Sequence, residues 1–189
     1  MTKEQLRKIY KQKRLAITEK EQVKLDDLLL IQFQQLPLDD VLLLFSYLPI
    51  AEKAEPQTEL FIQYLYFRIP GLQVAYPVSD LTGNSMQAIL VHDDTVYHTN
   101  RLGITEPTEG EVADPELIDL VFVPLLVADR QGNRVGYGKG FYDRYLKQCR
   151  EDAVKIGFSY FDPVDKIDDT QPFDVPLNYC ITPERIYEF

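Results

Sequence analysis

The first 35 residues carry apolar side chains at the spacing of amphipathic helices. Thr2 is followed three residues later by Gln5, and Thr18 is followed in the same way by Glu21. Both pairs match the capping box, in which a hydroxyl and a carboxylate or amide close the N-terminus of a helix. The pattern therefore predicts two helices within residues 2–35, which end before Pro37.

Beyond Pro37 the apolar residues come in short runs between turn residues, which is typical of buried strands. Pro77 should end one of these strands, 86–91 and 95–99 should form a hairpin, and 103–115 should be a loop. Strands that alternate with helices predict a single α/β domain over residues 1–189, with a largely parallel open sheet flanked by helices. We predict strands at 41–48, 73–76, 86–91, 95–99, 119–128, 155–160 and 179–182, and helices at 58–67 and 141–150.

Apolar run lengths and cysteine content narrow the class of protein. No apolar run approaches the roughly 20 residues that a membrane span needs, and the N-terminus lacks the pattern of a signal peptide. The two cysteines, Cys149 and Cys180, are too few for a disulfide framework, so we expect unlinked thiols of a reducing compartment. These features predict a cytoplasmic protein with no membrane partner.

The net charge of −10 argues against a nucleic-acid partner, because a basic surface should meet its phosphates. The charge is uneven, however: residues 1–14 hold six Lys or Arg against one acid, and residues 129–147 hold five against two. Two basic segments in an acidic chain indicate a small polyanionic ligand.

The basic residues of the first helix, Lys3, Arg7, Lys11 and Arg14, follow one another at steps of four, four and three. At 3.6 residues per turn they form a stripe along the border of the apolar face. Such a stripe can be ordinary snorkelling at a helix edge, or it can line the rim of a site against which the helix packs. The spacing alone leaves both open.

The most informative segment is GNRVGYGKGFYDRYL, residues 132–146, which follows a predicted buried strand and runs into a predicted helix. Glycines in this position let backbone N–H groups approach a phosphate, and basic residues add charge. A Walker A loop would need Ser or Thr where Gly140 stands, and a dinucleotide fingerprint would need Gly where Phe141 stands. The segment 129–143 is thus either a phosphate loop of another kind or a flexible connection.

Asp143 falls in the first turn of the helix that follows this loop. A carboxylate there interacts favourably with the helix dipole, and it is also a suitable ligand for Mg²⁺ beside phosphates. The pattern does not choose between these roles.

The loop 132–146 closely resembles the signature loop of the 5-formyltetrahydrofolate cyclo-ligase family, also called methenyltetrahydrofolate synthetases. Further segments agree in order along nearly the whole chain: KEQLR at 3–7 looks like the family's ATP-contacting helix, and FSYLPIAEKAEPQT at 45–58 resembles its folate-binding stretch. GITEP at 103–107 and VFVPLLVAD at 121–129 also match. The resemblance implies a three-layer fold related to ribose-phosphate isomerases and CoA transferases, with ATP and folate in one cleft.

The resemblance also assigns roles to individual residues. It implies that Lys139, Arg134 and Tyr142 are catalytic, that Asp143 binds Mg²⁺, and that Ile50, Glu55, Tyr137 and Tyr142 bind the substrate. Core filling at a helix start remains open for Tyr137 and Tyr142. The implied ATP-binding residues are Lys3, Arg7, Arg134, Val135, Gly136, Tyr137, Gly138, Lys139, Gly140, Phe141 and Tyr142.

The implied reaction converts 5-formyltetrahydrofolate into 5,10-methenyltetrahydrofolate, with release of ADP and phosphate. The γ-phosphoryl group of ATP would activate the formyl oxygen, the neighbouring nitrogen would close the ring, and phosphate would leave. The implied partners are ATP, Mg²⁺ and a reduced folate, which can be polyglutamylated, and the expected oligomeric state is a monomer.

Two other functions stay open at this point. One is a relative with the same ATP loop and a different substrate; the other is a non-catalytic protein that binds a nucleotide or folate. The chain departs from the family pattern at Leu125 and Leu126, and at Pro163 and Phe173, and the last two bear on the C-terminal side of the folate pocket.

Overall fold

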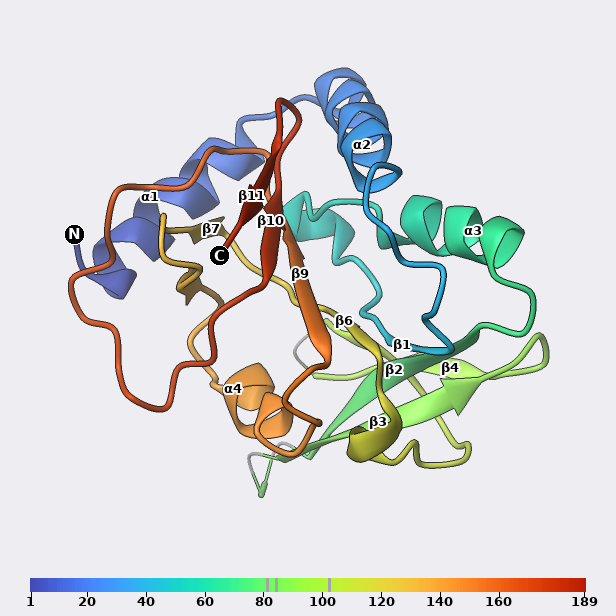
Figure 1. Cartoon of the computed structure of the whole chain (residues 1–189). Helices are drawn as coiled ribbons and strands as arrows, with labels where there is room; N and C mark the ends of the chain where they lie inside the picture. The colour runs from blue at the N-terminus through green and yellow to red at the C-terminus, as the bar shows by residue number, and fades with distance from the viewer. Residues whose placement is uncertain (81, 84, 102) are drawn as a thin grey trace.

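A mixed β-sheet forms the centre of the molecule, and helices cover both of its faces (Figure 1). The computed structural model describes residues 1–80, 82–83, 85–101 and 103–189. Within these residues the sheet has seven strands in the order β11-β10-β9-β6-β1-β2-β3, and only the two edge strands run antiparallel to their neighbours. The strands are β1 (Leu43–Phe45), β2 (Gln73–Asp80), β3 (Ser85–Val91), β6 (Leu120–Phe122), β9 (Val154–Phe158), β10 (Tyr179–Ile181) and β11 (Ile186–Glu188). The predicted α/β class and parallel sheet are confirmed.

The two predicted N-terminal helices are present, and both begin at the predicted caps. The Thr2 hydroxyl accepts from the Gln5 backbone N–H and the Gln5 side chain reaches back, so the capping box is complete. The Thr18 hydroxyl accepts from the Glu21 N–H. The α-helices are α1 (Lys3–Leu15), α2 (Glu19–Phe33), α3 (Thr58–Arg68) and α4 (Phe141–Leu146), and the 3-10 turns are η1 (Ala51–Lys53) and η2 (Pro115–Leu117). Within the described residues, no helix has the length and apolar character needed to cross a membrane.

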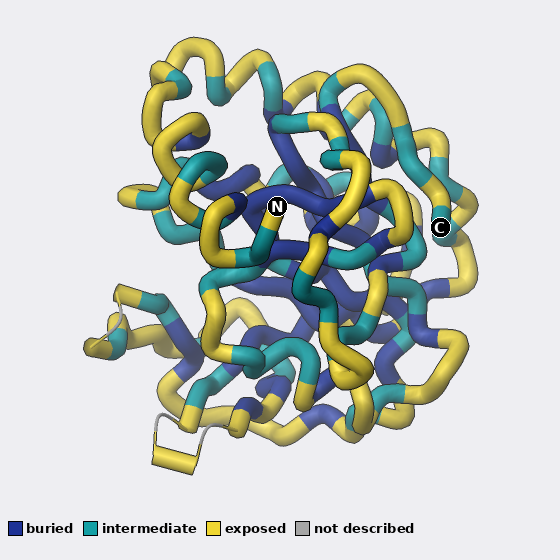
Figure 2. Tube along the Cα trace, turned by 90° about the vertical axis from the view of Figure 1, so that its left-hand side faces the viewer, coloured by how far each residue is buried: buried dark blue, intermediate teal, exposed yellow. Residues whose placement is uncertain are grey.

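Alternate residues of the central strands face the two sides of the sheet. Leu44 and Phe122 pack with Phe33 of α2 and Phe61 of α3, and the Phe33 and Phe122 rings lie 5.7 Å apart in an edge-to-face contact. Figure 2 shows the buried residues gathered in the middle of the chain, with exposed segments around them.

The opposite face of the sheet packs on α4. Leu43, Phe45 and Val121 join Tyr145 in a second core, because neighbouring strand residues point to opposite faces. The ring centroids of Phe45 and Tyr145 lie 4.8 Å apart. This packing fixes the helix that follows the Gly-rich loop against the centre of the sheet.

Helix α1 has a core of its own, beside a small hairpin of β7 (Val127–Ala128) and β8 (Arg134–Val135). Leu6 packs there with Leu126 and Val135, and each of these side chains is at most 2% exposed. The basic border of α1 is thereby held beside the Gly-rich loop.

Several predicted boundaries are wrong. The predicted strand 119–128 divides into β6 and β7, and β7 turns away to pair with β8, which lies inside the predicted loop. Of the predicted strand 41–48, only Leu43–Phe45 form a strand, β1. The predicted helix 141–150 ends at Leu146. The last strand, β11, was not predicted.

Pro77 does not end its strand, because β2 continues to Asp80. Strand β1 pairs only with the first part of β2, and Pro77 therefore has a strand partner on one side only, Ala88 of β3. Proline is tolerated where its missing N–H would not be needed for a second partner strand.

The predicted hairpin of 86–91 with 95–99 is also wrong. Strand β3 pairs along its length with β2, whereas β4 (Tyr97–Thr99) pairs with β5 (Thr105–Pro107), which lies in the predicted loop 103–115. Pairing between segments that are close in sequence was the simpler expectation, but pairing with β2 places Met86 and Ala88 of β3 in the second core.

Candidate active site

A cavity of about 520 Å³ opens beyond the C-terminal ends of β1 and β6. Tyr47 lines it two residues after β1, and Pro124 two residues after β6. The chain continues from β1 to β2 on one side and from β6 to β9 on the other, so the strand order reverses between β1 and β6. Open α/β sheets bind ligands at such a switch point.

The structure places nearly all of the predicted site residues around this one cavity. The exception is Val135, which is fully buried in the core beneath α1. The departure Phe173 also lines the cavity, whereas Pro163 does not belong to its lining. The predicted residues that line it are Lys3, Arg7, Ile50, Glu55, Arg134, Gly136, Tyr137, Gly138, Lys139, Gly140, Phe141, Tyr142 and Asp143.

The basic stripe of α1 divides into two parts. Lys3, Arg7 and Lys11 line the cavity, and the Arg7 Nε–H donates to the carbonyl oxygen of Gly136 at 2.9 Å. Arg14 lies deeper and is 3% exposed. Simple snorkelling into solvent therefore does not describe Arg7 and Arg14, because both reach residues from distant parts of the chain.

Three glycines of the Gly-rich loop have positive φ: Gly132 at 80°, Gly138 at 89° and Gly140 at 67°. A Cβ on Gly138 would also lie 3.3 Å from the guanidinium carbon of Arg7. The positive φ therefore favours glycine at these positions, and at Gly138 the Arg7 side chain leaves little room for a Cβ. Lys139, between Gly138 and Gly140, is exposed and forms no ion pair among the described residues.

Arg134 and Asp143, which both line the cavity, form an ion pair. An Arg134 guanidinium N–H donates to Asp143 Oδ1 at 2.8 Å, and another donates to the Val175 carbonyl. The Val175 N–H also donates to Asp143 Oδ1, at 3.1 Å. In this arrangement Arg134 orients Asp143, rather than pointing freely at a ligand.

Asp143 is suited to a metal only together with other ligands. Its Oδ1 accepts both hydrogen bonds, and Oδ2 accepts none from the described residues. No group of three or more His, Cys, Asp and Glu side chains that could hold a metal occurs among the residues described.

Glu55 also lines the cavity and is 3% exposed. Its Oε2 accepts from the Ile50 N–H at 2.7 Å, and its Oε1 accepts from the Tyr137 hydroxyl. The Lys53 ammonium lies 4.3 Å from the centre of the Tyr137 ring. Burial, then the charge of Glu55, raises the pKa of Tyr137, while burial lowers the pKa of Lys53.

Tyr142 fills the core, and its role in substrate binding stays a prediction. Its ring stacks on Phe45 with centroids 6.0 Å apart, and this contact fills the core. Its hydroxyl is buried and has no hydrogen-bond partner among the described residues. Burial, followed by the charge of Glu55, raises the pKa of Tyr142, so this group stays a hydroxyl donor. An unpaired hydroxyl beside a cavity favours a polar ligand atom opposite it.

From the sequence, no role in ligand binding was predicted for Tyr47, Lys53 or Arg14. Tyr47 and Lys53 lie inside the segment 45–58 that carried the resemblance, so their position in that segment could have indicated that they line the site. Arg14 was named only as the end of a stripe, and nothing local shows that it contacts Tyr137.

Comparisons with known proteins agree with this geometry. The 5-formyltetrahydrofolate cyclo-ligase family matches residues 1–183. A 5-formyltetrahydrofolate cyclo-ligase of Mycoplasma pneumoniae is 30% identical over 188 residues, which cover 97% of this chain and 100% of that one. A cyclo-ligase of Mus musculus is 50% identical over 50 residues, which cover 24% of this chain and 25% of that one.

Solved structures show the same likeness. The NMR structure of the 5,10-methenyltetrahydrofolate synthetase of Aquifex aeolicus has a TM-score of 0.81 and 28% identity, and covers 100% of this chain and 93% of that chain. A 5,10-methenyltetrahydrofolate synthetase of Mycoplasma pneumoniae has a TM-score of 0.75 and 28% identity, with 96% and 98% covered. The chain therefore belongs to the 5-formyltetrahydrofolate cyclo-ligase family, a family of ligases.

Proposed function

We propose that this protein converts 5-formyltetrahydrofolate and ATP into 5,10-methenyltetrahydrofolate, ADP and phosphate in the cavity beyond β1 and β6. The observation that carries the proposal is that one cavity is lined both by the basic residues of α1 and the Gly-rich loop and by the buried carboxylate of Glu55. The basic residues suit an anionic ligand such as a phosphate, and the carboxylate suits a ligand that carries N–H groups. We call these two parts the phosphate end and the folate end.

The phosphate end of the cavity consists of α1 and the Gly-rich loop. Lys3, Arg7 and Lys139 supply positive charge, and the glycines let the ATP phosphates approach the backbone. Lys3 pairs with Asp174, whereas Lys139 is exposed, forms no ion pair among the described residues and would contact the γ-phosphoryl group. Mg²⁺ bound to the phosphates would neutralise charge there, and Asp143, oriented by Arg134, would hold it.

The folate end is built from Ile50, Glu55, Tyr137 and Tyr142. The Glu55 carboxylate retains acceptor capacity beyond its two hydrogen bonds and can accept from an N–H edge of the pterin. The unpaired Tyr142 hydroxyl can donate to the formyl oxygen or to a neighbouring polar atom. Lys11 and Lys53 line the same cavity and would attract the glutamate carboxylates of a folate or polyglutamate.

The chemistry needs activation because a formyl amide is a weak electrophile. Transfer of the γ-phosphoryl group to the formyl oxygen turns that oxygen into a leaving group. The adjacent folate nitrogen then attacks the formyl carbon and releases its proton to solvent, the carbon–oxygen bond breaks, and phosphate leaves with the former formyl oxygen. The protein contributes orientation and charge stabilisation, as in phosphoryl transfer generally, and needs no covalent nucleophile.

A spectrophotometric assay tests the proposal directly. Purified protein is mixed with 5-formyltetrahydrofolate, ATP and Mg²⁺, and the methenyl product is followed; ATP and metal are left out in turn. We expect product only in the complete mixture. ATP binding without product would contradict the proposal and would favour a relative with a changed substrate or a binding protein.

A further inference from the structure

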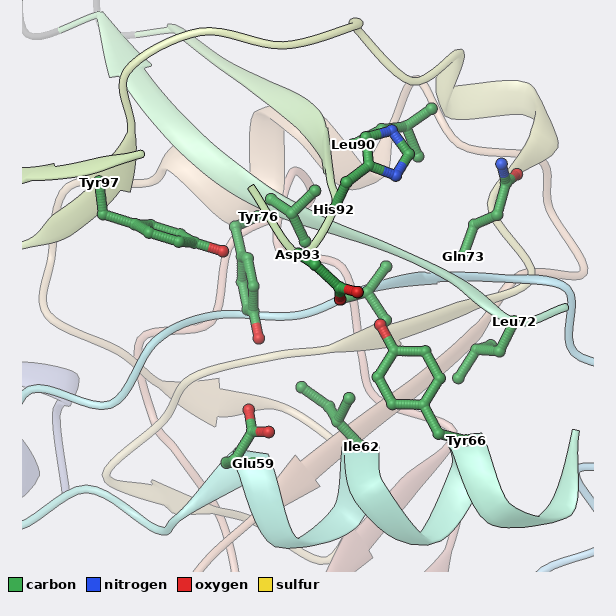
Figure 3. A pocket seen from close by; sticks show the side chains of 12 residues that line it. Glu59, Ile62, Tyr66, Leu72, Gln73, Tyr76, Leu90, His92, Asp93 and Tyr97 are labelled. Carbon is green, nitrogen blue, oxygen red and sulfur yellow. The ribbon is translucent and has the colours of Figure 1, made fainter. Parts of the chain in front are cut away.

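A second cavity, of about 600 Å³, lies between α3 and the strands β2 and β3 at the edge of the sheet (Figure 3). It shares no lining residue with the candidate active site. Ile62, Leu72 and Val74 form its apolar floor, and all three belong to the core shared by α2, α3 and the sheet. The floor is therefore part of the packed core, and the exposed residues His92 and Asp93, in the turn between β3 and β4, also line the cavity.

Three tyrosines from separate elements stand around this floor: Tyr66 of α3, Tyr76 of β2 and Tyr97 of β4 (Figure 3). The ring centroids of Tyr76 and Tyr97 lie 6.3 Å apart, with the planes at 68°. Tyrosine ring faces carry negative charge density and attract a cation within about 6 Å. The three rings therefore form a partial aromatic enclosure.

Negative charge adds to that of the ring faces. Glu59 and Asp93 line the cavity, and no lysine or arginine is among its lining residues. Glu59 accepts a hydrogen bond from the Gln63 side chain at 3.1 Å, and neither carboxylate forms an ion pair among the described residues. Burial raises the pKa of Tyr76 and Tyr97, and the charge of Glu59 acts in the same direction on both.

We propose that this cavity is a binding site for a small organic cation with an apolar body, such as an aryl- or alkylammonium. The apolar part would lie on Ile62 and Val74, and the ammonium group would lie between the tyrosine rings and the two carboxylates. An anion would meet Glu59 and Asp93, and a neutral ligand would gain nothing from them. The positive charge is therefore the feature that the site selects.

Phenethylammonium is a suitable probe, and 2-phenylethanol is its uncharged counterpart. Each is titrated into ¹⁵N-labelled full-length protein, and the amide shifts are followed. We expect saturable shifts with phenethylammonium, confined to α3, β2, β3 and the 92–97 turn. The dissociation constant should be at least fivefold smaller for the amine than for the alcohol.

Variants that remove the carboxylate charges test whether these charges cause the preference for a cation. Glu59→Gln together with Asp93→Asn should weaken phenethylammonium binding about tenfold. Glu59 lies in the first turn of α3, so thermal melting checks that the helix is kept. Glu116→Gln is the matched control, because Glu116 is exposed, lies in the first turn of η2 and is absent from the cavity.

Tyr97→Leu, on an exposed strand, keeps an apolar surface but removes one ring. It should weaken the binding of phenethylammonium more than the binding of 2-phenylethanol. Three results would each overturn the proposal. They are equal affinity for amine and alcohol, unchanged affinity in the folded double variant, and shifts that fail to saturate or that lie elsewhere.

Discussion

The guanidinium of Arg14 and the carboxylate of Glu55 lie 4.0 Å apart in the interior, and each side chain is only 3% exposed. The Tyr137 hydroxyl lies between them, accepting from Arg14 and donating to Glu55. Arg14 also donates to the Leu125 carbonyl at 3.0 Å. One buried contact thus joins α1, the Gly-rich loop and the folate end of the proposed site.

Arg14→Met should lower the free energy of unfolding by about 3 kcal/mol, because it leaves the Glu55 charge buried without its cation. Urea denaturation at neutral pH measures the change. Lys13→Met is the matched control on the exposed side of α1 and should stay within about 0.5 kcal/mol. A loss below about 1 kcal/mol in Arg14→Met would show that Glu55 does not depend on Arg14.

Glu55→Gln should weaken 5-formyltetrahydrofolate binding about 10- to 100-fold, since a charge-assisted hydrogen bond to the ligand becomes a neutral one. ATP affinity should stay within twofold, because the proposed phosphate ligands are the basic side chains and backbone of α1 and the Gly-rich loop and not the Glu55 carboxylate. Equilibrium dialysis with each ligand separates the two effects. Glu52→Gln, exposed in the adjacent η1 turn, serves as the control. Equal folate affinity in Glu55→Gln and the unaltered protein would remove Glu55 from the folate site.

Lys139→Ala should lower kcat about 100-fold while the folate dissociation constant stays unchanged, because the lysine is proposed to stabilise the phosphoryl group during transfer. The exposed position of Lys139 makes a folding defect unexpected. Lys166→Ala, at another exposed lysine outside the cavity, should keep full activity. Undiminished turnover in Lys139→Ala would exclude the proposed role.

The variant Asp26→Asn should make the protein more stable than the unaltered chain at neutral pH. Asp26 is 2% exposed, and burial raises its pKa above the ordinary value of 3.8, against hydrogen bonds from Tyr160 and the Gln57 N–H that lower it. An acid with a raised pKa binds its proton more tightly in the folded state, so its ionisation costs stability as pH rises through that window.

The variant's advantage should therefore be absent at pH 3, grow as pH rises from 3.8 through the raised pKa, and then level off. Chemical denaturation at several pH values measures it. Asp27→Asn, at the exposed neighbouring position, is the control and should show a much smaller dependence. A pH-independent difference for Asp26→Asn would mean that packing, not ionisation, dominates at this site.

Local signals predicted local structure well. The caps at Thr2 and Thr18 set the starts of α1 and α2, because capping depends on residues only three apart. The Gly-rich segment was expected at the end of a buried strand, and Gly138 and Gly140 do adopt positive φ there. These features depend on neighbouring residues and can be read from the chain.

Features that depend on distant residues could not be predicted. The pairing of β3 with β2 rather than β4, and the division of 119–128 between two sheets, follow from which apolar surfaces meet in the folded protein. The engagement of Arg134 with Asp143 and Val175 is of the same kind. From the sequence, Arg134 was expected to bind a phosphate, whereas in the folded protein its guanidinium binds Asp143 and the Val175 carbonyl.

Transfer of the formyl oxygen to phosphate is the central chemical claim, and isotope labelling tests it most directly. 5-Formyltetrahydrofolate carrying ¹⁸O in its formyl group is converted in the presence of ATP and Mg²⁺, and the inorganic phosphate released is analysed by mass spectrometry. Our account predicts one ¹⁸O atom in the phosphate for each methenyl product formed. Unlabelled phosphate, or ATP consumption without methenyl product, would contradict it.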